Sequence, residues 1–132
     1  MILFKKDERK KLSRSFHSGE FECRCAEDCG VQEISDVLID KLQKVRDAFG
    51  SPLIITSAYR CKAHQERLRA SGILTAVGKS THEMGIAVDI SVQASKMAKL
   101  LTILEEHFEA IGIARNFYHV DLRDEKKRRW KY

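Results

Sequence analysis

The segment STHEMGIAVDISV, at residues 80–92, is the stretch around which the rest of the chain is organised. Its second part, residues 86–92, alternates in the manner of a β-strand, so every second side chain shares one face with Asp89. His82 lies in the loop that leads into this strand, and Gly85 allows a tight approach between the two. A histidine and a carboxylate are therefore expected at one place beside a strand.

A second histidine follows in the segment FYHVDLR, at residues 117–123, which we expect to form the last strand of the sheet. Alternation along a strand puts His119, Asp121 and Arg123 on one face. If this strand neighbours the first, Asp89 and His119 are directed to one point. Two histidines and one carboxylate are the protein ligands of an open catalytic zinc site, which keeps a fourth position for water. These residue types alone also fit buried polar side chains that are satisfied by hydrogen bonds.

Helices and one further strand surround these two segments. A helix capped by Ser35 and Asp36 carries apolar residues at helical spacing up to Phe49 and ends at Gly50. Pro52 then begins an apolar, β-branched stretch that is typical of a buried strand. The expected elements are a helix over residues 36–49, a strand over 53–59, a helix over 63–70, a strand over 86–92, a helix over 95–111 and a strand over 117–122. This order predicts an α+β fold with a small, mainly antiparallel sheet and flanking helices.

Composition limits the classes of protein to which the chain can belong. Its 132 residues, 43% hydrophobic and 33% charged, suit a single compact domain. No apolar run approaches the roughly 20 residues that span a bilayer, so no membrane partner is expected. The chain reaches Lys5 after four residues, before the apolar stretch of a secretory signal could form. We expect a protein made in the cytoplasm without a signal peptide, and a monomer.

The positive charge is concentrated at the two ends of the chain. The net charge is +5, but residues 1–14 and 123–132 hold 12 of the 24 Lys and Arg and only 4 of the 19 Asp and Glu, which gives +8 there and −3 between them. We expect basic tails at residues 1–14 and 124–132 around one domain at residues 15–123. Such tails are either solvated or attracted to an anionic polymer. No nucleic-acid-binding motif accompanies them, so a nucleic-acid partner is not expected.

Four separated blocks of the chain resemble, in order, the zinc D-Ala-D-Ala carboxypeptidase and endopeptidase family of the hedgehog/D,D-peptidase fold. The blocks are FHSGEFECRC at residues 16–25, the helix over 42–49, IITSAYRC at 54–61, and the pair S-x-H-x-x-G-x-A-x-D and H-V-D-x-R that begins at Ser80 and ends at Arg123. The resemblance covers residues 15–123. It implies that His82, Asp89 and His119 bind one catalytic zinc ion.

The resemblance also implies roles for residues around the zinc. Arg60 matches an arginine that holds the substrate and stabilises charge on the carbonyl oxygen, and Ser80 matches a serine that hydrogen-bonds substrate or steadies the ligand loop. Family members place a general base about three positions before the last histidine, where this chain has Asn116, which accepts no proton. We therefore expect Asp121 to be the catalytic base. The alternative is that Asp121 orients His119.

The four cysteines allow three interpretations. Cys23, Cys25 and Cys29 lie close together in the sequence, and Cys61 directly follows Arg60. They could bind a second, structural zinc ion, although C-x-C-x-x-x-C is not a common zinc-ribbon spacing. They could instead form a disulfide that joins residues 16–25 to Cys61, or remain free thiols. Either crosslink would pin residues 16–25 over the arginine.

The activity implied by the resemblance is hydrolysis of a peptide bond in the stem peptide of bacterial peptidoglycan. Family members remove a terminal D-alanine or cut an L-alanyl-D-glutamate-type bond, and the sequence does not decide between these. The chain is similar to small phage or prophage lysis enzymes (endolysins), which another protein releases to the cell wall. The alternatives are a non-catalytic zinc-binding recognition module, as in the hedgehog signalling domain, and a nucleic-acid-binding domain built on the basic ends.

Overall fold

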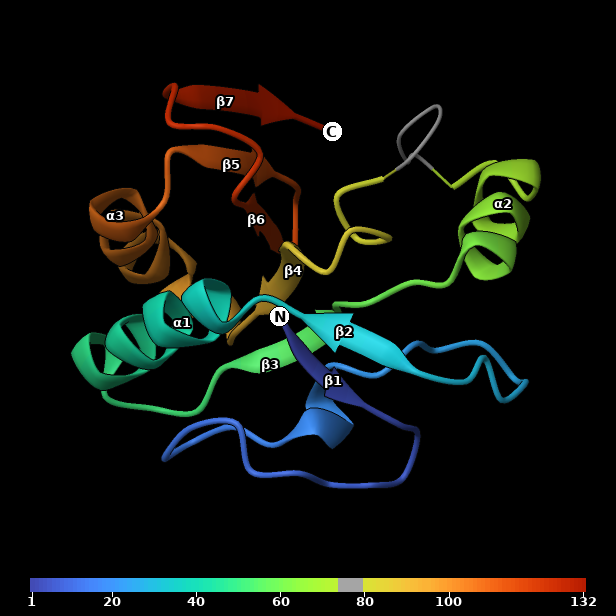
Figure 1. Ribbon diagram of the computed structural model, residues 1–132. Coiled ribbons are helices and arrows are strands. Elements are labelled where there is room, and N and C mark those ends of the chain that lie inside the picture. Colours follow the sequence, from blue (N-terminus) through green and yellow to red (C-terminus); the bar gives the residue numbers. More distant parts are fainter. Residues whose placement is uncertain (74–79) are drawn as a thin grey trace.

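A five-stranded sheet forms the centre of the molecule in the computed structural model, which describes residues 1–73 and 80–132 (Figure 1). The strand order is β3-β4-β6-β5-β7, and every neighbouring pair is antiparallel except the parallel pair β5 and β7. The fold is α+β, as the sequence predicts. The strands are β3 (Ile54–Ser57), β4 (Ala87–Ser91), β5 (Ala110–Ile113), β6 (Tyr118–Asp121) and β7 (Arg128–Lys131).

A two-stranded antiparallel sheet and the helices flank this centre. Figure 1 shows α1 and α3 side by side next to the larger sheet, with α2 apart from them. Among the described residues, no helix is long and apolar enough to cross a membrane. The smaller sheet pairs β1 (Ile2–Phe4) with β2 (Gln32–Ile34); the helices are α1 (Asp36–Phe49), α2 (Lys62–Ala70) and α3 (Met97–His107), with 3-10 turns at Ser18–Glu20 and Ala94–Lys96.

Helix α1 has the ends that its sequence predicts. The Ser35 hydroxyl accepts a hydrogen bond from the Leu38 amide at 3.2 Å, which satisfies one of the free N–H groups of the first turn. Gly50 adopts the left-handed conformation, with φ of 80°, and its amide donates to the Arg46 carbonyl. Leu38 and Leu42 on the inner face are fully buried. Helix α1 therefore packs one apolar face against the core, in contact with α3.

The long helix expected over residues 95–111 is wrong at its C-terminal end. Helix α3 ends at His107, and Phe108 already has extended backbone angles, φ −127° and ψ 136°. The next residues form β5, which the sequence analysis missed. Ala110 and Ile111 are fully buried, and β5 lies between β6 and β7 in the sheet. A short apolar run buried on both faces has no alternation, so its pattern does not separate a strand from the end of a helix.

Strand β3 is not the buried strand that its composition suggests. Within the described residues it lies at an edge of the sheet and pairs only with β4. Ile54 is 58% exposed, whereas its neighbour Ile55 is 7% exposed. An edge strand of an antiparallel sheet buries one face and leaves the other to solvent, which explains the alternation.

The two ends of the chain differ from the expected basic tails. Phe4 in β1 is 2% exposed and belongs to the main hydrophobic core. At the other end, β7 adds a strand to the larger sheet beside β5, and this strand carries Trp130. An apolar or aromatic side chain among the basic residues anchors each end, so both ends contribute secondary structure to the fold.

We predict that Gly85→Ala destabilises the protein by about 3 kcal/mol. Gly85 has φ of +71°, and an added Cβ would lie 2.7 Å from the Glu33 backbone oxygen, which cannot move as the end of a flexible side chain can. Gly50→Ala is the matched control, because Gly50 has φ of +80° with open space around it. Its cost should be about 1–2 kcal/mol. Equal losses in urea unfolding of the two variants would contradict the predicted clash.

Candidate metal centre

The centre of the site is a pair of residues that face each other across two strands. Asp89 in β4 is the register partner of His119 in β6, and Asp89 Oδ1 lies 2.9 Å from His119 Nδ1. His82, from the loop before β4, places Nε2 3.4 Å from the same oxygen. One ligand atom from each of the three residues lies within 4.8 Å of the other two. The predicted neighbourhood of the two strands is confirmed, and the three side chains are all buried.

The hydrogen bonds of the two histidines decide which nitrogen faces the centre. His82 Nδ1 lies 2.7 Å from the Ala58 carbonyl oxygen, which only accepts, so Nδ1 donates and Nε2 keeps a free lone pair. His119 Nε2 lies 2.7 Å from Asp121 Oδ2, which leaves Nδ1 toward Asp89. Metal-binding histidines commonly give their second nitrogen to a carbonyl or a carboxylate in this way. The donor set therefore fits zinc, with His82, Asp89 and His119 as the residues that would hold it.

Burial and the hydrogen bonds between the three residues shift their pKa values. Burial lowers the pKa of His82, which favours the neutral ring that a metal ligand requires. Burial alone would raise the pKa of Asp89, but the hydrogen bond from His119 holds it well below its usual range. Burial lowers the pKa of His119, and its hydrogen bonds to Asp121 and Asp89 outweigh burial and raise it. A metal ion bound at Nδ1 would take the place of the proton that His119 shares with Asp89.

Asp121 lies behind His119. Its side chain is fully buried, and it accepts hydrogen bonds from His119 Nε2 and from Arg123 Nη2, each at 2.7 Å. Burial would raise the pKa of Asp121, but these bonds hold it well below its usual range, which makes the carboxylate a weak proton acceptor. These contacts support the orienting role, and the role as general base stays a prediction. Asn116, three positions before His119, is exposed, and its backbone carbonyl accepts a hydrogen bond from Ser91.

Arg60 reaches the other oxygen of the ligand carboxylate. Its Nη2 lies 3.3 Å from Asp89 Oδ2, its Nε donates to Ser57 Oγ at 2.9 Å, and its Nη1 donates to Gln65 Oε1 at 3.2 Å. Gln65 is 1% exposed on α2 and was missed, because one buried polar residue in a polar helix gives no periodic signal. Ser80 is also buried, and its hydroxyl accepts a hydrogen bond from the His82 amide at 3.1 Å, so it steadies the ligand loop.

One row of residues runs across all five strands and passes through the centre. Register partners along it are Ser57, Asp89, His119, Gly112 and Trp130, from β3 to β7. A Cβ on Gly112 would lie 2.6 Å from Trp130 Nε1, so the missing side chain makes room for the indole. The Trp130 and His119 ring centroids are therefore only 5.6 Å apart although a strand separates their backbones.

The row borders a cavity of about 890 Å³ that contains the candidate metal ligands. The C-terminal segment forms one wall, where the Arg123 guanidinium lies 4.5 Å from the centre of the Trp130 ring. Tyr132 lies beyond it, against Phe117. The sequence does not indicate that this wall borders the site, because nothing in the spacing of its residues shows that β7 joins the sheet. The lining residues that carry side chains of functional interest are Arg60, Ser80, His82, Asp89, His119, Arg123, Trp130 and Tyr132.

The chain belongs to the peptidase M15 family, since the family model described as Peptidase M15 matches residues 14–121. The match contains the three candidate metal ligands together with Arg60 and Asp121. It confirms the resemblance found in the sequence, and it implies a zinc-dependent metallopeptidase. The comparison with curated proteins finds no match for this chain.

We predict that Asp121→Asn weakens zinc binding by about 10- to 100-fold while the fold is retained, because the variant removes the charge that orients His119 Nε2. The measurement is a zinc competition titration with a chelating dye, with circular dichroism to check folding. Asp124→Asn is the matched control, since Asp124 pairs with Arg128 and belongs neither to the ligand set nor to the cavity lining, so its loss should leave the affinity unchanged. Unchanged zinc affinity in Asp121→Asn, together with lost activity, would instead favour the general-base role.

Proposed function

We propose that this protein is a zinc peptidase that hydrolyses a peptide bond in the stem peptide of bacterial peptidoglycan. The observation that carries the proposal is the buried set of His82, Asp89 and His119 at the wall of a large open cavity, within a chain of the M15 family. Three protein ligands with space beside them are the arrangement of a catalytic zinc site, whereas a structural site closes with a fourth protein ligand.

The residues of the chain prepare this site before any substrate arrives. Zinc held there supplies a Lewis acid for the scissile carbonyl and acidifies a water molecule. The Ala58 carbonyl and the Asp121 carboxylate fix the two imidazole rings, so neither ring has to reorient during the reaction. Because these supports come from the backbone and from a fully buried side chain, the ligand positions are rigid.

Arg60 is the residue that we assign to the substrate. Its side chain is 11% exposed and lines the cavity beside Asp89. Contacts with Ser57 and Gln65 hold the guanidinium in one orientation. A planar, permanently charged fork in that position suits a substrate carboxylate or the negative charge that develops on the carbonyl oxygen. Ser80, in the same lining, is proposed to steady the ligand loop and to meet the substrate.

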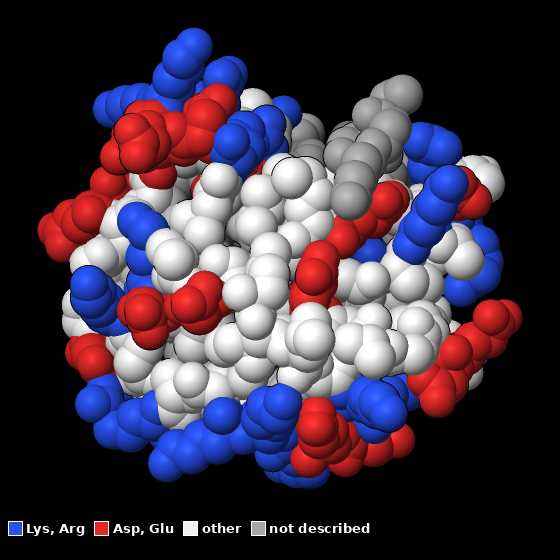
Figure 2. All heavy atoms as spheres, in the orientation of Figure 1, with Lys and Arg blue, Asp and Glu red and all other residues white. Residues whose placement is uncertain are grey.

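The charge of the cavity wall supports an anionic peptide as the substrate. Arg123, Lys127 and Arg128 line the cavity on its C-terminal side. Stem peptides carry free carboxylates at D-glutamate and at the terminal D-alanine, and a cationic wall attracts such groups. Figure 2 shows further Lys and Arg side chains along the margins of one face, including those over the N-terminal segment and beside β7, with Asp and Glu side chains among them. We propose that these margins hold the enzyme against anionic wall polymers, with the bacterial cell wall as its place of action after release by a phage lysis system.

The zinc-loaded protein is predicted to release new fragments from purified cell-wall peptides, detected by liquid chromatography and mass spectrometry. His82→Ala should lower product formation to the uncatalysed background, because it removes a zinc ligand. His107→Ala is the control for loss of a histidine, since His107 ends α3 and belongs to neither the ligand set nor the cavity lining. The masses of the fragments identify the bond that is cut.

Intact peptides after incubation with protein shown to contain zinc would overturn the enzymatic proposal. That outcome would favour the non-catalytic zinc module, for which the specific observations are Asn116 in the usual position of the base and the engagement of Asp121 by His119 and Arg123. Binding of the same peptides without turnover, measured by calorimetry, would then define the module as a recognition domain.

A further inference from the structure

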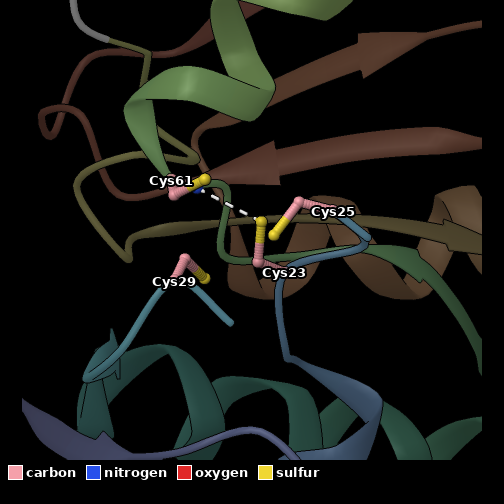
Figure 3. Close-up of side chains that lie close together, drawn as sticks. All are labelled: Cys23, Cys25, Cys29 and Cys61. Atoms are coloured by element: carbon pink, nitrogen blue, oxygen red, sulfur yellow. Dashed lines mark hydrogen bonds between the residues drawn. The ribbon is translucent and has the colours of Figure 1, made fainter. Parts of the chain in front are cut away.

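A second group of possible metal ligands consists of all four cysteines of the chain, here called the cysteine cluster: Cys23, Cys25, Cys29 and Cys61. Cys23 and Cys25 follow the first 3-10 turn, Cys29 lies in the loop before β2, and Cys61 caps the N-terminus of α2. Figure 3 shows their sulfurs directed into a common space, from three segments of the chain. Neither the catalytic proposal nor the family match assigns these residues a role.

The distances fit a single ion bound by four thiolates. All four sulfurs lie within 4.8 Å of one another. In a tetrahedral zinc site with bonds of about 2.3 Å, the sulfurs are about 3.8 Å apart, so closing the cluster requires movements of about 1 Å or less. All four residues are described, and each is a free thiol. A disulfide, with a sulfur-to-sulfur bond of about 2.05 Å, would use two of the sulfurs and leave the other two without a function.

N–H groups lie within hydrogen-bond distance of three of the four sulfurs. The Cys61 amide donates to Cys23 Sγ at 3.3 Å, and the His64 amide donates to Cys61 Sγ at 3.4 Å. Gln32 Nε2 lies 3.5 Å from Cys29 Sγ. Such N–H groups stabilise metal-bound thiolates and fix their direction.

The fourth sulfur, that of Cys25, and a nearby lysine also fit a metal site. Cys25 Sγ donates to the Glu27 carbonyl at 3.1 Å, through the proton that a metal would displace. The ammonium group of Lys6 donates to the Cys25 carbonyl at 3.3 Å, which brings a positive charge close to the cluster. A centre of four thiolates and Zn²⁺ carries a net charge of about −2, which a nearby cation stabilises.

We propose that the cysteine cluster binds one zinc ion as a closed, structural site. Four protein sulfurs fill a tetrahedral coordination sphere and leave no position for water, so this ion takes no direct part in chemistry. The unusual spacing C-x-C-x-x-x-C in the sequence is no obstacle, because the ligands come from three segments and not from two zinc-ribbon loops.

The zinc ion joins the N-terminal segment to the residues that follow β3. The Tyr59 amide donates to the Phe21 carbonyl, and Arg24 donates to the Ile55 carbonyl, so the two segments already lie together. Cys61 directly follows Arg60. The cysteines therefore act as positioning residues for Arg60, a consequence that rests on the proposed function, whereas the metal site itself does not.

Cobalt binding tests the site without relying on activity. Cobalt bound by thiolates gives intense near-ultraviolet charge-transfer absorption, and the chain has no cysteine outside the cluster. We expect this absorption when the reduced, metal-free full chain is titrated with Co²⁺. His82→Ala should retain it in full, and Cys29→Ser should reduce it. The wild-type titration needs no variant, so a misfolded variant cannot hide the result.

Zinc content measured by atomic emission supplies the second readout. Protein purified under reducing conditions should contain two zinc ions per chain, and His82→Ala and Cys29→Ser should each lose one of them. Absence of the charge-transfer absorption from the wild-type titration would overturn the proposal. A disulfide in the native protein would also overturn the proposal. It would be seen by mass spectrometry of the unreduced protein as the loss of hydrogen from two cysteines. Failure of the catalytic proposal is distinguishable, because it would leave cell-wall peptides intact while the wild-type titration still gave the charge-transfer absorption.

Discussion

The contact between Asp89 in β4 and His119 in β6 is the constraint on which the rest of the structure depends. It exists because the two strands pair with Val88 opposite Val120, and both valines are fully buried. A shift of one residue in this register would turn the valines out of the core and the two site residues away from each other. The apolar burial that fixes the sheet therefore also fixes two of the three candidate zinc ligands.

Support for the site comes from both sides of this pair. On the β3 side, Ser57 accepts a hydrogen bond from Arg60, which faces the cavity. On the β7 side, Gly112 has no side chain, and this leaves room for Trp130 to approach His119. Asp89, His119 and these neighbours are strand residues of one sheet, so backbone pairing sets their positions, whereas His82 comes from the loop before β4. The zinc ion proposed for the cysteine cluster would add a further fixed point, since Cys61 directly follows Arg60.

The sequence predicts those parts of the molecule that have a local signal. The capped helix that ends at Gly50, the two strands that carry Asp89 and His119, and the three candidate ligands are all evident from spacing or from family motifs. Strand β5 and the place of Trp130 in the sheet are not, because both depend on pairing between distant segments. For the same reason the sequence leaves open whether the four cysteines bind zinc, form a disulfide or stay free: three segments must fold together before a tetrahedral site exists.

Anomalous diffraction from crystals of the zinc-loaded protein, with data collected on both sides of the zinc absorption edge, is the most direct test of the catalytic centre. We predict a zinc peak among His82 Nε2, Asp89 Oδ1 and His119 Nδ1, with Asp121 still bonded to His119 Nε2. A space without a peak between these atoms, or zinc bound at the opposite nitrogen of His119, would contradict the site described above.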